Sequence, residues 1–230
     1  MDEYLFQLVN QYNGRWPAFD VFVDLLTLSH FKAGPITLLL WALWFRPNDE
    51  ISRQSIRTGL TSALIITLPL ILIGRLLAEL LPFKHRPIHT PDFAVNMSEF
   101  QTVMELNGWS SMPSDHAVLF FGLATALLWV NRKAAVFAFA WTLVIICLPR
   151  IFFGWHWPSD IAVGALIGIA TAALLFIPIK AVVGWSGIIP YFEARPWVGY
   201  PILFFLTYEL TQMFPLAREI VSLLFEGQVG

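Results

Sequence analysis

The chain has 230 residues, of which 57% are hydrophobic and 13% charged, and its mean hydropathy is +0.66. This composition is too apolar for an ordinary soluble domain and indicates a membrane protein. A net charge of −2 without a long basic run argues against nucleic acid as a partner, because nucleic-acid binding depends mainly on neutralising phosphates. The single cysteine, Cys147, excludes an intrachain disulfide and a cysteine-based metal site.

The first 32 residues are expected to lie at the membrane interface. Polar and acidic residues interrupt the N-terminal segment, so a cleavable signal peptide is not expected. Apolar residues from Phe19 to Phe31 recur at helical spacing, which fits either an extension of the first span or an interfacial helix. The interfacial helix is favoured because four ionisable residues would be costly in lipid: Asp20, Asp24, His30 and Lys32.

Six apolar segments approach the roughly 20 residues that a spanning helix needs. The sequence therefore predicts an all-α, polytopic membrane helical bundle with six transmembrane helices, forming a single domain over residues 1–230. In chain order the segments are Ala33 to Phe45, Thr58 to Leu81, His116 to Val130, Ala134 to Pro149, Ile161 to Ile179 and Val198 to Phe214.

Basic residues at the boundaries assign the two sides of the membrane. Because Lys and Arg collect on the cytoplasmic side, the more basic set of loops is placed there. Segment 83–115, the turn 150–158 and both termini then face outward. The cytoplasmic set holds Arg46, Arg53, Arg57, Arg132, Lys133, Lys180 and Arg195.

One polar cluster joins the fourth and fifth predicted spans through Arg150, His156 and Asp160. Pro158 suits the first turn of a helix, which puts Asp160 in that turn as well. The Asp160 carboxylate can then accept a hydrogen bond from one ring nitrogen of His156 and leave the other nitrogen as a nucleophile. Arg150 offers a planar fork of donors to phosphate oxygens. An interfacial ion pair beside a boundary histidine is the structural alternative.

A second cluster, Pro113-Ser114-Asp115-His116, opens the third predicted span. Ser110 or Ser111 could cap a helix whose first turn contains Pro113. The helix start would offer amide hydrogens and the Ser114 hydroxyl to phosphate oxygens, with His116 beside them as general acid. Ordinary helix-start chemistry is an equally good explanation of this cluster taken alone.

A third cluster follows the second predicted span, where Lys84 and Arg86 lie close together. Taken alone, basic side chains reaching from a span to the interface explain it better than catalysis. Together with Arg150, they would supply the positive charge that stabilises a phosphoryl transition state without a metal ion. Arg75 and Glu79, four residues apart in the span, are expected to form a structural salt bridge.

These three clusters resemble the signature of the type 2 phosphatidic acid phosphatase family. Its third part, R-x5-H-x3-D, is matched in full by Arg150, His156 and Asp160. Its second part, usually P-S-G-H, appears as Pro-Ser-Asp-His, which is similar to bacterial undecaprenyl diphosphate phosphatases of the family. Its first part, K-x6-R-P, is matched only by Arg86 and Pro87. Glu79 occupies the lysine position, so Lys84 or Arg75 is the candidate substitute.

The resemblance implies a metal-independent lipid phosphatase without a cofactor, multi-pass in the bacterial inner membrane, with its active site facing the periplasm or outside. His156 attacks phosphorus, His116 protonates the leaving group, Asp160 orients His156, and water hydrolyses the phosphohistidine. The candidate phosphate-binding residues are Arg86, Arg150, Ser114, Asp115 and Lys84.

The substrate is expected to be a lipid phosphate or diphosphate, and the Asp115 variant favours undecaprenyl diphosphate, for cell-wall biogenesis. Phosphatidylglycerol phosphate, phosphatidic acid and a lipid A phosphate are the alternatives. A lipid or ion transporter using Arg75, Glu79 and Glu209, or a catalytically silent lipid-binding member, are different classes. Headgroup selection is assigned to segment 88–112, including Asp92, Asn96, Glu99, Glu105 and Asn107.

Overall fold

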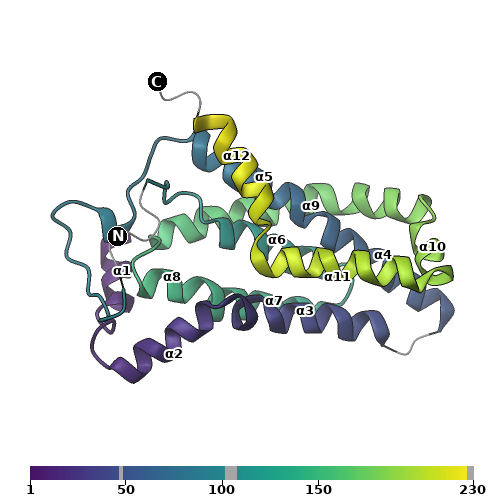
Figure 1. Cartoon of the computed structure of the whole chain (residues 1–230), viewed down its shortest axis with the longest axis horizontal. Coiled ribbons are helices and arrows are strands. Elements are labelled where there is room, and N and C mark those ends of the chain that lie inside the picture. The colour runs from purple at the N-terminus through teal and green to yellow at the C-terminus, as the bar shows by residue number, and fades with distance from the viewer. Residues whose placement is uncertain (47–48, 102–107, 227–230) are drawn as a thin grey trace.

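A computed structural model describes residues 1–46, 49–101 and 108–226, and these residues form helices joined by loops (Figure 1). In chain order the elements are α1 (Asp2–Asn10), α2 (Pro17–Thr27), α3 (Ser29–Phe45), α4 (Glu50–Ile65), α5 (Thr67–Leu80), the 3-10 turn η1 (Pro87–His89), α6 (Asp115–Leu127), α7 (Arg132–Trp141), the π-helical segment η2 (Thr142–Cys147), α8 (Leu148–Phe152), α9 (Pro158–Trp185), α10 (Ile188–Ala194), α11 (Pro196–Gln212) and α12 (Pro215–Glu226).

Three continuous helical stretches of the described chain are long and apolar enough to cross a membrane: Glu50–Leu80, Arg132–Phe152 and Pro158–Trp185. The other expected spans correspond to α3 and α11, with 17 residues each, and to α6, with 13. A tilted span needs at least about 17 residues, so α6 alone is short. The all-helical class is confirmed, and the total of six transmembrane helices stays a prediction.

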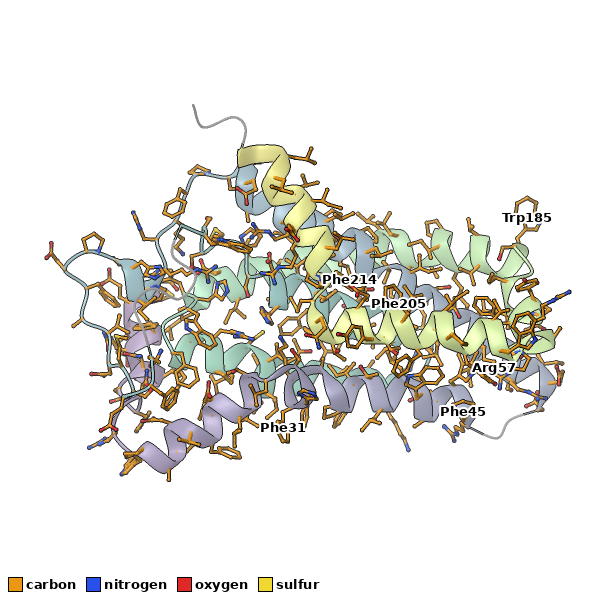
Figure 2. The ribbon with its side chains drawn as sticks, in the orientation of Figure 1. Phe31, Phe45, Arg57, Trp185, Phe205 and Phe214 are labelled. Carbon is orange, nitrogen blue, oxygen red and sulfur yellow. The ribbon has the colours of Figure 1, made fainter. Side chains whose placement is uncertain are left out.

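The outer surface of the bundle is apolar. Figure 2 shows Phe31, Phe45 and Trp185 at its edge, and these side chains are 52%, 58% and 91% exposed. Soluble proteins rarely expose apolar patches of this extent. Together with the three long apolar helices, this surface identifies a membrane protein.

The N-terminal segment differs in detail from the expected single interfacial helix. Leu28 has an extended backbone (φ −61°, ψ 141°), so α2 ends at Thr27 and α3 begins at Ser29. The stretch from Phe19 to Phe31 is therefore divided between two helices. Lys32, expected to be costly in lipid, is buried inside the bundle against His116. The interfacial position of α1 and α2 remains a prediction.

The two sets of loops lie at opposite ends of the bundle, as the alternation of spans requires (Figure 1). At one end, Arg57 of α4 binds Glu193 of α10 at 2.5 Å. At the other end, α1 meets the start of α9, where Asp2 accepts a hydrogen bond from the Ser159 amide. The three polar clusters share this second end, which we call the motif end.

Small residues bring α6 and α9 close together. A Cβ atom on Gly168 would lie 2.2 Å from the Val118 carbonyl oxygen, and one on Gly164 would lie 2.8 Å from the Ser114 carbonyl oxygen. Glycines spaced four residues apart on one helical face permit such backbone contact between membrane helices. This contact positions the cluster that opens α6 against the cluster that opens α9.

Candidate active site

His156 lies in the turn between α8 and α9. Gly154 adopts φ +72°, a left-handed conformation that favours glycine, and reverses the chain after α8. The amides of Trp155 and His156 then both donate to the Arg150 carbonyl oxygen, at 2.9 and 3.1 Å. Pro158 opens α9, which confirms the expected helix start.

The His156 ring is held by a backbone carbonyl rather than by the expected carboxylate. Nδ1 donates to the Ser111 carbonyl oxygen at 2.8 Å, whereas Oδ2 of Asp160 is 3.7 Å away, beyond hydrogen-bond distance. The reason is that Oδ2 already accepts hydrogen bonds from the Trp157 amide and the Ser111 hydroxyl. The Ser111 carbonyl therefore fixes the tautomer, and Nε2 is left as the unprotonated ring nitrogen.

Burial lowers the pKa of His156 below its usual value of 6.5, and the charges of Arg86 and Arg150 act in the same direction. The Asp160 carboxylate opposes this shift and raises the pKa in part. The net effect favours the neutral imidazole at neutral pH. A neutral imidazole is the form that can attack phosphorus.

Asp160 is fully buried in the first turn of α9. Its Oδ1 accepts a hydrogen bond from Lys84 Nζ at 2.7 Å, and Lys84 also contacts Asp2 and the Ser159 hydroxyl. Lys84 was expected to bind phosphate. Its ammonium instead pairs with the Asp160 carboxylate, which lies close to His156.

Arg86 joins the loops that carry the other two clusters. Its guanidinium donates to the carbonyl oxygens of Trp109, Ser110 and Trp155, at 3.2, 3.1 and 2.6 Å. The nitrogen bound to Trp155 also lies 3.2 Å from Nε2 of His156. Burial lowers the pKa of Arg86 to about 10, which still leaves it cationic at neutral pH. Arg86 thus places a positive charge beside His156.

The start of α6 differs from the expected helix. The helix begins at Asp115 with Ser114 as its N-cap residue, so Pro113 lies outside the first turn. The Ser111 hydroxyl is used by Asp160 rather than as a cap. The amide of Ser114 donates to the Asp160 carbonyl oxygen, and its buried hydroxyl has no hydrogen-bond partner among the described residues. A role for Ser114 in phosphate binding stays a prediction.

His116 faces two cations. Its Nε2 lies 2.8 Å from an Arg150 nitrogen and 3.3 Å from Lys32 Nζ. Nε2 is therefore the acceptor of these contacts, and Lys32 adds to the site a basic side chain from α3. Sequence reasoning placed Lys32 in the interfacial segment and missed this position.

Asp115 pairs with two arginines, although it was expected among the phosphate-binding residues. Its Oδ2 lies 3.7 Å from Arg75 and 3.5 Å from Arg218 of α12. Arg75 also binds Glu79 at 2.6 Å, which confirms the expected salt bridge. A carboxylate repels phosphate, so Asp115 fits the site as a counterion for these arginines. Arg218 carried no signal in the sequence.

A cavity of about 240 Å³ opens among these side chains. Five cations line it, together with His116, His156 and one carboxylate, Asp115. Neither Lys84 nor Ser114 belongs to its lining. The surplus of positive charge suits a phosphate or diphosphate group. The five cations are Lys32, Arg75, Arg86, Arg150 and Arg218.

Segment 88–112 is expected to select the headgroup, but some of its residues contact the N-terminal helix instead. The Asn96 amide nitrogen donates to the Asn10 side chain at 2.8 Å, which fixes the loop to α1. Glu105 and Asn107 lie outside the described residues. Headgroup selection by this segment stays a prediction.

Residues 79–182 match the model of the PAP2 superfamily, and this range includes all three polar clusters. The match covers less than half of the chain, which is similar to that superfamily over this range. The family resemblance of the three motifs is thereby confirmed.

Individual relatives are similar over part of their length. A 71-residue stretch is 37% identical to the bacitracin transport permease protein BcrC of Bacillus licheniformis, and covers 29% of this chain but only 32% of that protein. The undecaprenyl-diphosphatase BcrC of Bacillus subtilis is 27% identical over 155 residues, covering 65% of this chain and 70% of that protein. The crystal structure of LpxE from Aquifex aeolicus is similar with a TM-score of 0.50 and 25% identity, over 75% of this chain and 93% of LpxE.

Proposed function

We propose that this protein hydrolyses a lipid diphosphate to the lipid monophosphate and inorganic phosphate, with His156 as the nucleophile. One observation carries the proposal: Nε2 of a neutral His156, fixed through Nδ1 by the Ser111 carbonyl, lies beside a cavity lined by five cations. An aligned nucleophile and preorganised positive charge are the two requirements of phosphoryl transfer.

In the first step, Nε2 of His156 attacks the terminal phosphorus and forms a P–N bond. The bond from that phosphorus to the bridging oxygen breaks, and the electron pair stays on the bridging oxygen of the leaving lipid phosphate. Nε2 of His116 delivers a proton to this oxygen. Before this step, the anionic substrate would draw Arg150 and Lys32 toward its own oxygens, so that Nε2 of His116 loses these donors and takes up a proton from solvent.

In the second step, water attacks the phosphohistidine. The neutral His116 takes a proton from this water, the P–N bond breaks, and inorganic phosphate leaves with His156 regenerated. Asp160 stabilises the cationic ring during both steps because its carboxylate lies 3.7 Å from Nδ1. The cations of the chain neutralise the developing charge, so the reaction is expected to need no metal ion.

The substrate class we favour is a polyprenyl diphosphate such as undecaprenyl diphosphate. The similarity to the undecaprenyl-diphosphatase of Bacillus subtilis and the high positive charge of the cavity support this choice. We place the protein in the bacterial inner membrane with its motif end facing outward. Recycling of a lipid carrier for cell-wall synthesis would follow from that activity and location.

A transport function is the second candidate, because one similar protein bears the name of a bacitracin transport permease. Arg75 and Glu79 would belong to the pathway in that case. Both instead contribute to the motif end, where Arg75 lines the same cavity as the two histidines. This arrangement supports catalysis over transport.

The test is phosphate release by detergent-purified protein with chelator present, from undecaprenyl diphosphate, phosphatidylglycerol phosphate and phosphatidic acid. His156→Ala is compared with wild type and with His85→Ala, which removes an exposed imidazole from the same end of the molecule. We expect release from the diphosphate to be lost only in His156→Ala. Undiminished release in that variant, or none in wild type, would contradict the proposal and favour transport.

A further inference from the structure

Two of the five basic residues that line the cavity, Arg75 and Arg218, contact Asp115 and Trp109 rather than the two histidines. Arg75 and Arg218 both contact Asp115, and both guanidinium groups stack on the Trp109 ring, at 4.3 and 5.2 Å from its centre. Arg86 and Arg150, by contrast, approach His156 and His116 directly. The cavity thus contains a group of cations beside the reacting nitrogens and a second group, Arg75 and Arg218, beside Trp109.

The second group is built rather than incidental. Arg75 is 3% exposed, and α12 packs against α5 (Figure 1). Arg218 of α12 lines the cavity. Nε of Arg75 is buried without a hydrogen-bond partner among the described residues, whereas Nε of Arg218 faces Oδ2 of Asp115 at 3.5 Å. A buried donor without a partner, such as Nε of Arg75, is costly unless a ligand completes it. Asp115 is shared between the two arginines, and Arg75 also pairs with Glu79.

Asp115 holds Arg75 and Arg218 together. It occupies the position that is usually glycine in the family motif, and its carboxylate is the shared counterion of Arg75 and Arg218. Both arginines lie outside residues 79–182, the part that matches the PAP2 superfamily. The family match therefore does not assign them.

We propose that Arg75 and Arg218, held by Asp115 and Trp109, form a second phosphate subsite that binds the lipid-linked phosphate of a diphosphate substrate. This inference rests on the proposed function. Arg86 and Arg150 would hold the terminal phosphoryl group as it is transferred to His156. The second subsite would hold the phosphate that departs with the lipid.

The chemistry of the leaving group gives the subsite its effect. When the bond between the terminal phosphorus and the bridging oxygen breaks, the leaving lipid phosphate gains a negative charge. A phosphate monoester carries about −1.5 to −2 charges at pH 7, so neighbouring cations stabilise its departure strongly. A lipid monophosphate has no second phosphate, and its leaving alkoxide relies on the proton from His116. The subsite thus selects diphosphates over monophosphates.

The test compares kcat/KM for undecaprenyl diphosphate and phosphatidic acid in wild type and in Arg218→Gln. We expect a loss of about ten- to a hundredfold with the diphosphate, as for one lost charged contact, and a change under about threefold with the monophosphate. Arg218→Lys should recover part of the diphosphate rate. Arg132→Gln, an exposed arginine of α7, is the matched control and should alter neither rate.

A second variant, Asp115→Gly, restores the usual family residue and removes the counterion. It should shift the preference toward the monophosphate, with thermal unfolding recorded to show that the fold persists. Equal loss on both substrates in Arg218→Gln, or no loss on either, would overturn the second subsite.

Binding separates this inference from the proposed function. Inorganic pyrophosphate should raise the thermal unfolding temperature of wild type more than inorganic phosphate does, and Arg218→Gln should abolish the difference. Wild-type protein could show the larger stabilisation by pyrophosphate and yet no hydrolysis that depends on His156. That result would contradict the proposed phosphatase activity and support the second subsite. Equal protection by both ions in wild type would overturn the subsite while leaving the phosphatase intact.

Discussion

Lys84 Nζ lies 2.7 Å from Oδ1 of Asp160, on the carboxylate that supports the nucleophile. The sequence placed Lys84 among the candidate phosphate-binding residues, whereas in the structure its ammonium binds Asp160. The expected substitute for the family lysine acts on Asp160, which is fully buried, and only through it on His156. We therefore infer that Lys84 positions Asp160 and, through it, His156.

Lys84→Met should therefore lower kcat more than it changes KM. Loss of the ammonium leaves Asp160 with one fewer donor and loosens its hold on the Ser111 and Trp157 contacts. We expect kcat to fall roughly ten- to a hundredfold, with KM within about threefold. Steady-state kinetics on the preferred lipid measure both constants. A raised KM with kcat retained would place Lys84 on the substrate instead.

As the pH is lowered, kcat/KM should begin to fall only below pH 6.5. The pKa of His156 is lowered by burial, so the nucleophile stays neutral, and active, to lower pH than an exposed histidine would. Asp160 raises this pKa, and Asp160→Asn should consequently move the limb of the residual activity to still lower pH. An acid limb above pH 6.5, or a shift to higher pH in the variant, is incompatible with this environment.

Arg86→Lys should inactivate the protein although it preserves the charge. A lysine cannot donate at once to the Trp109, Ser110 and Trp155 carbonyl oxygens, because these bonds use the planar fork of the guanidinium. We expect kcat/KM to fall at least about a hundredfold, as several charged hydrogen bonds are lost. The same assay gives the result. Activity near that of wild type would mean that charge alone is required.

Gly168→Ala should destabilise the bundle at the contact between α6 and α9. The new methyl group would lie 2.2 Å from the Val118 carbonyl oxygen, so the helices must separate. Overpacking of this kind costs about 1–3 kcal/mol. Gly34→Ala is the matched control, because among the described residues its added methyl group would meet nothing within 4 Å outside its own stretch of helix, and its unfolding temperature should not fall. Thermal unfolding in detergent compares them. Equal stability of both variants would show that the close approach is not needed.

The local features of the site could be predicted from the sequence, whereas its long-range contacts could not. Pro158 and Asp160 begin α9 as helix-start preferences require, and Arg75 pairs with Glu79 across one helical turn. Lys32 and Arg218 were missed because they come from α3 and α12, far from the motifs in the chain. Their burial depends on how helices pack, which no spacing within one segment encodes.

The same difference between local and long-range contacts explains why the ring of His156 has another hydrogen-bond partner than the one predicted. An i, i+4 relation to Asp160 indicated a direct hydrogen bond, yet the ring donates to the Ser111 carbonyl, 45 residues away in sequence. Ser111 also supplies the hydroxyl that occupies Asp160. Both contacts depend on the α6–α9 packing. Sequence periodicity located the residues, and tertiary structure decided which atoms meet.

The most direct test of the account is detection of the phosphohistidine. Wild-type protein is mixed with undecaprenyl diphosphate labelled in its terminal phosphate, quenched within the first turnover under alkaline conditions, and mapped by mass spectrometry. The account predicts the label on His156 and on no other residue, with no label in His156→Ala. Label on a different side chain, or turnover at the wild-type rate in His156→Ala, would contradict it.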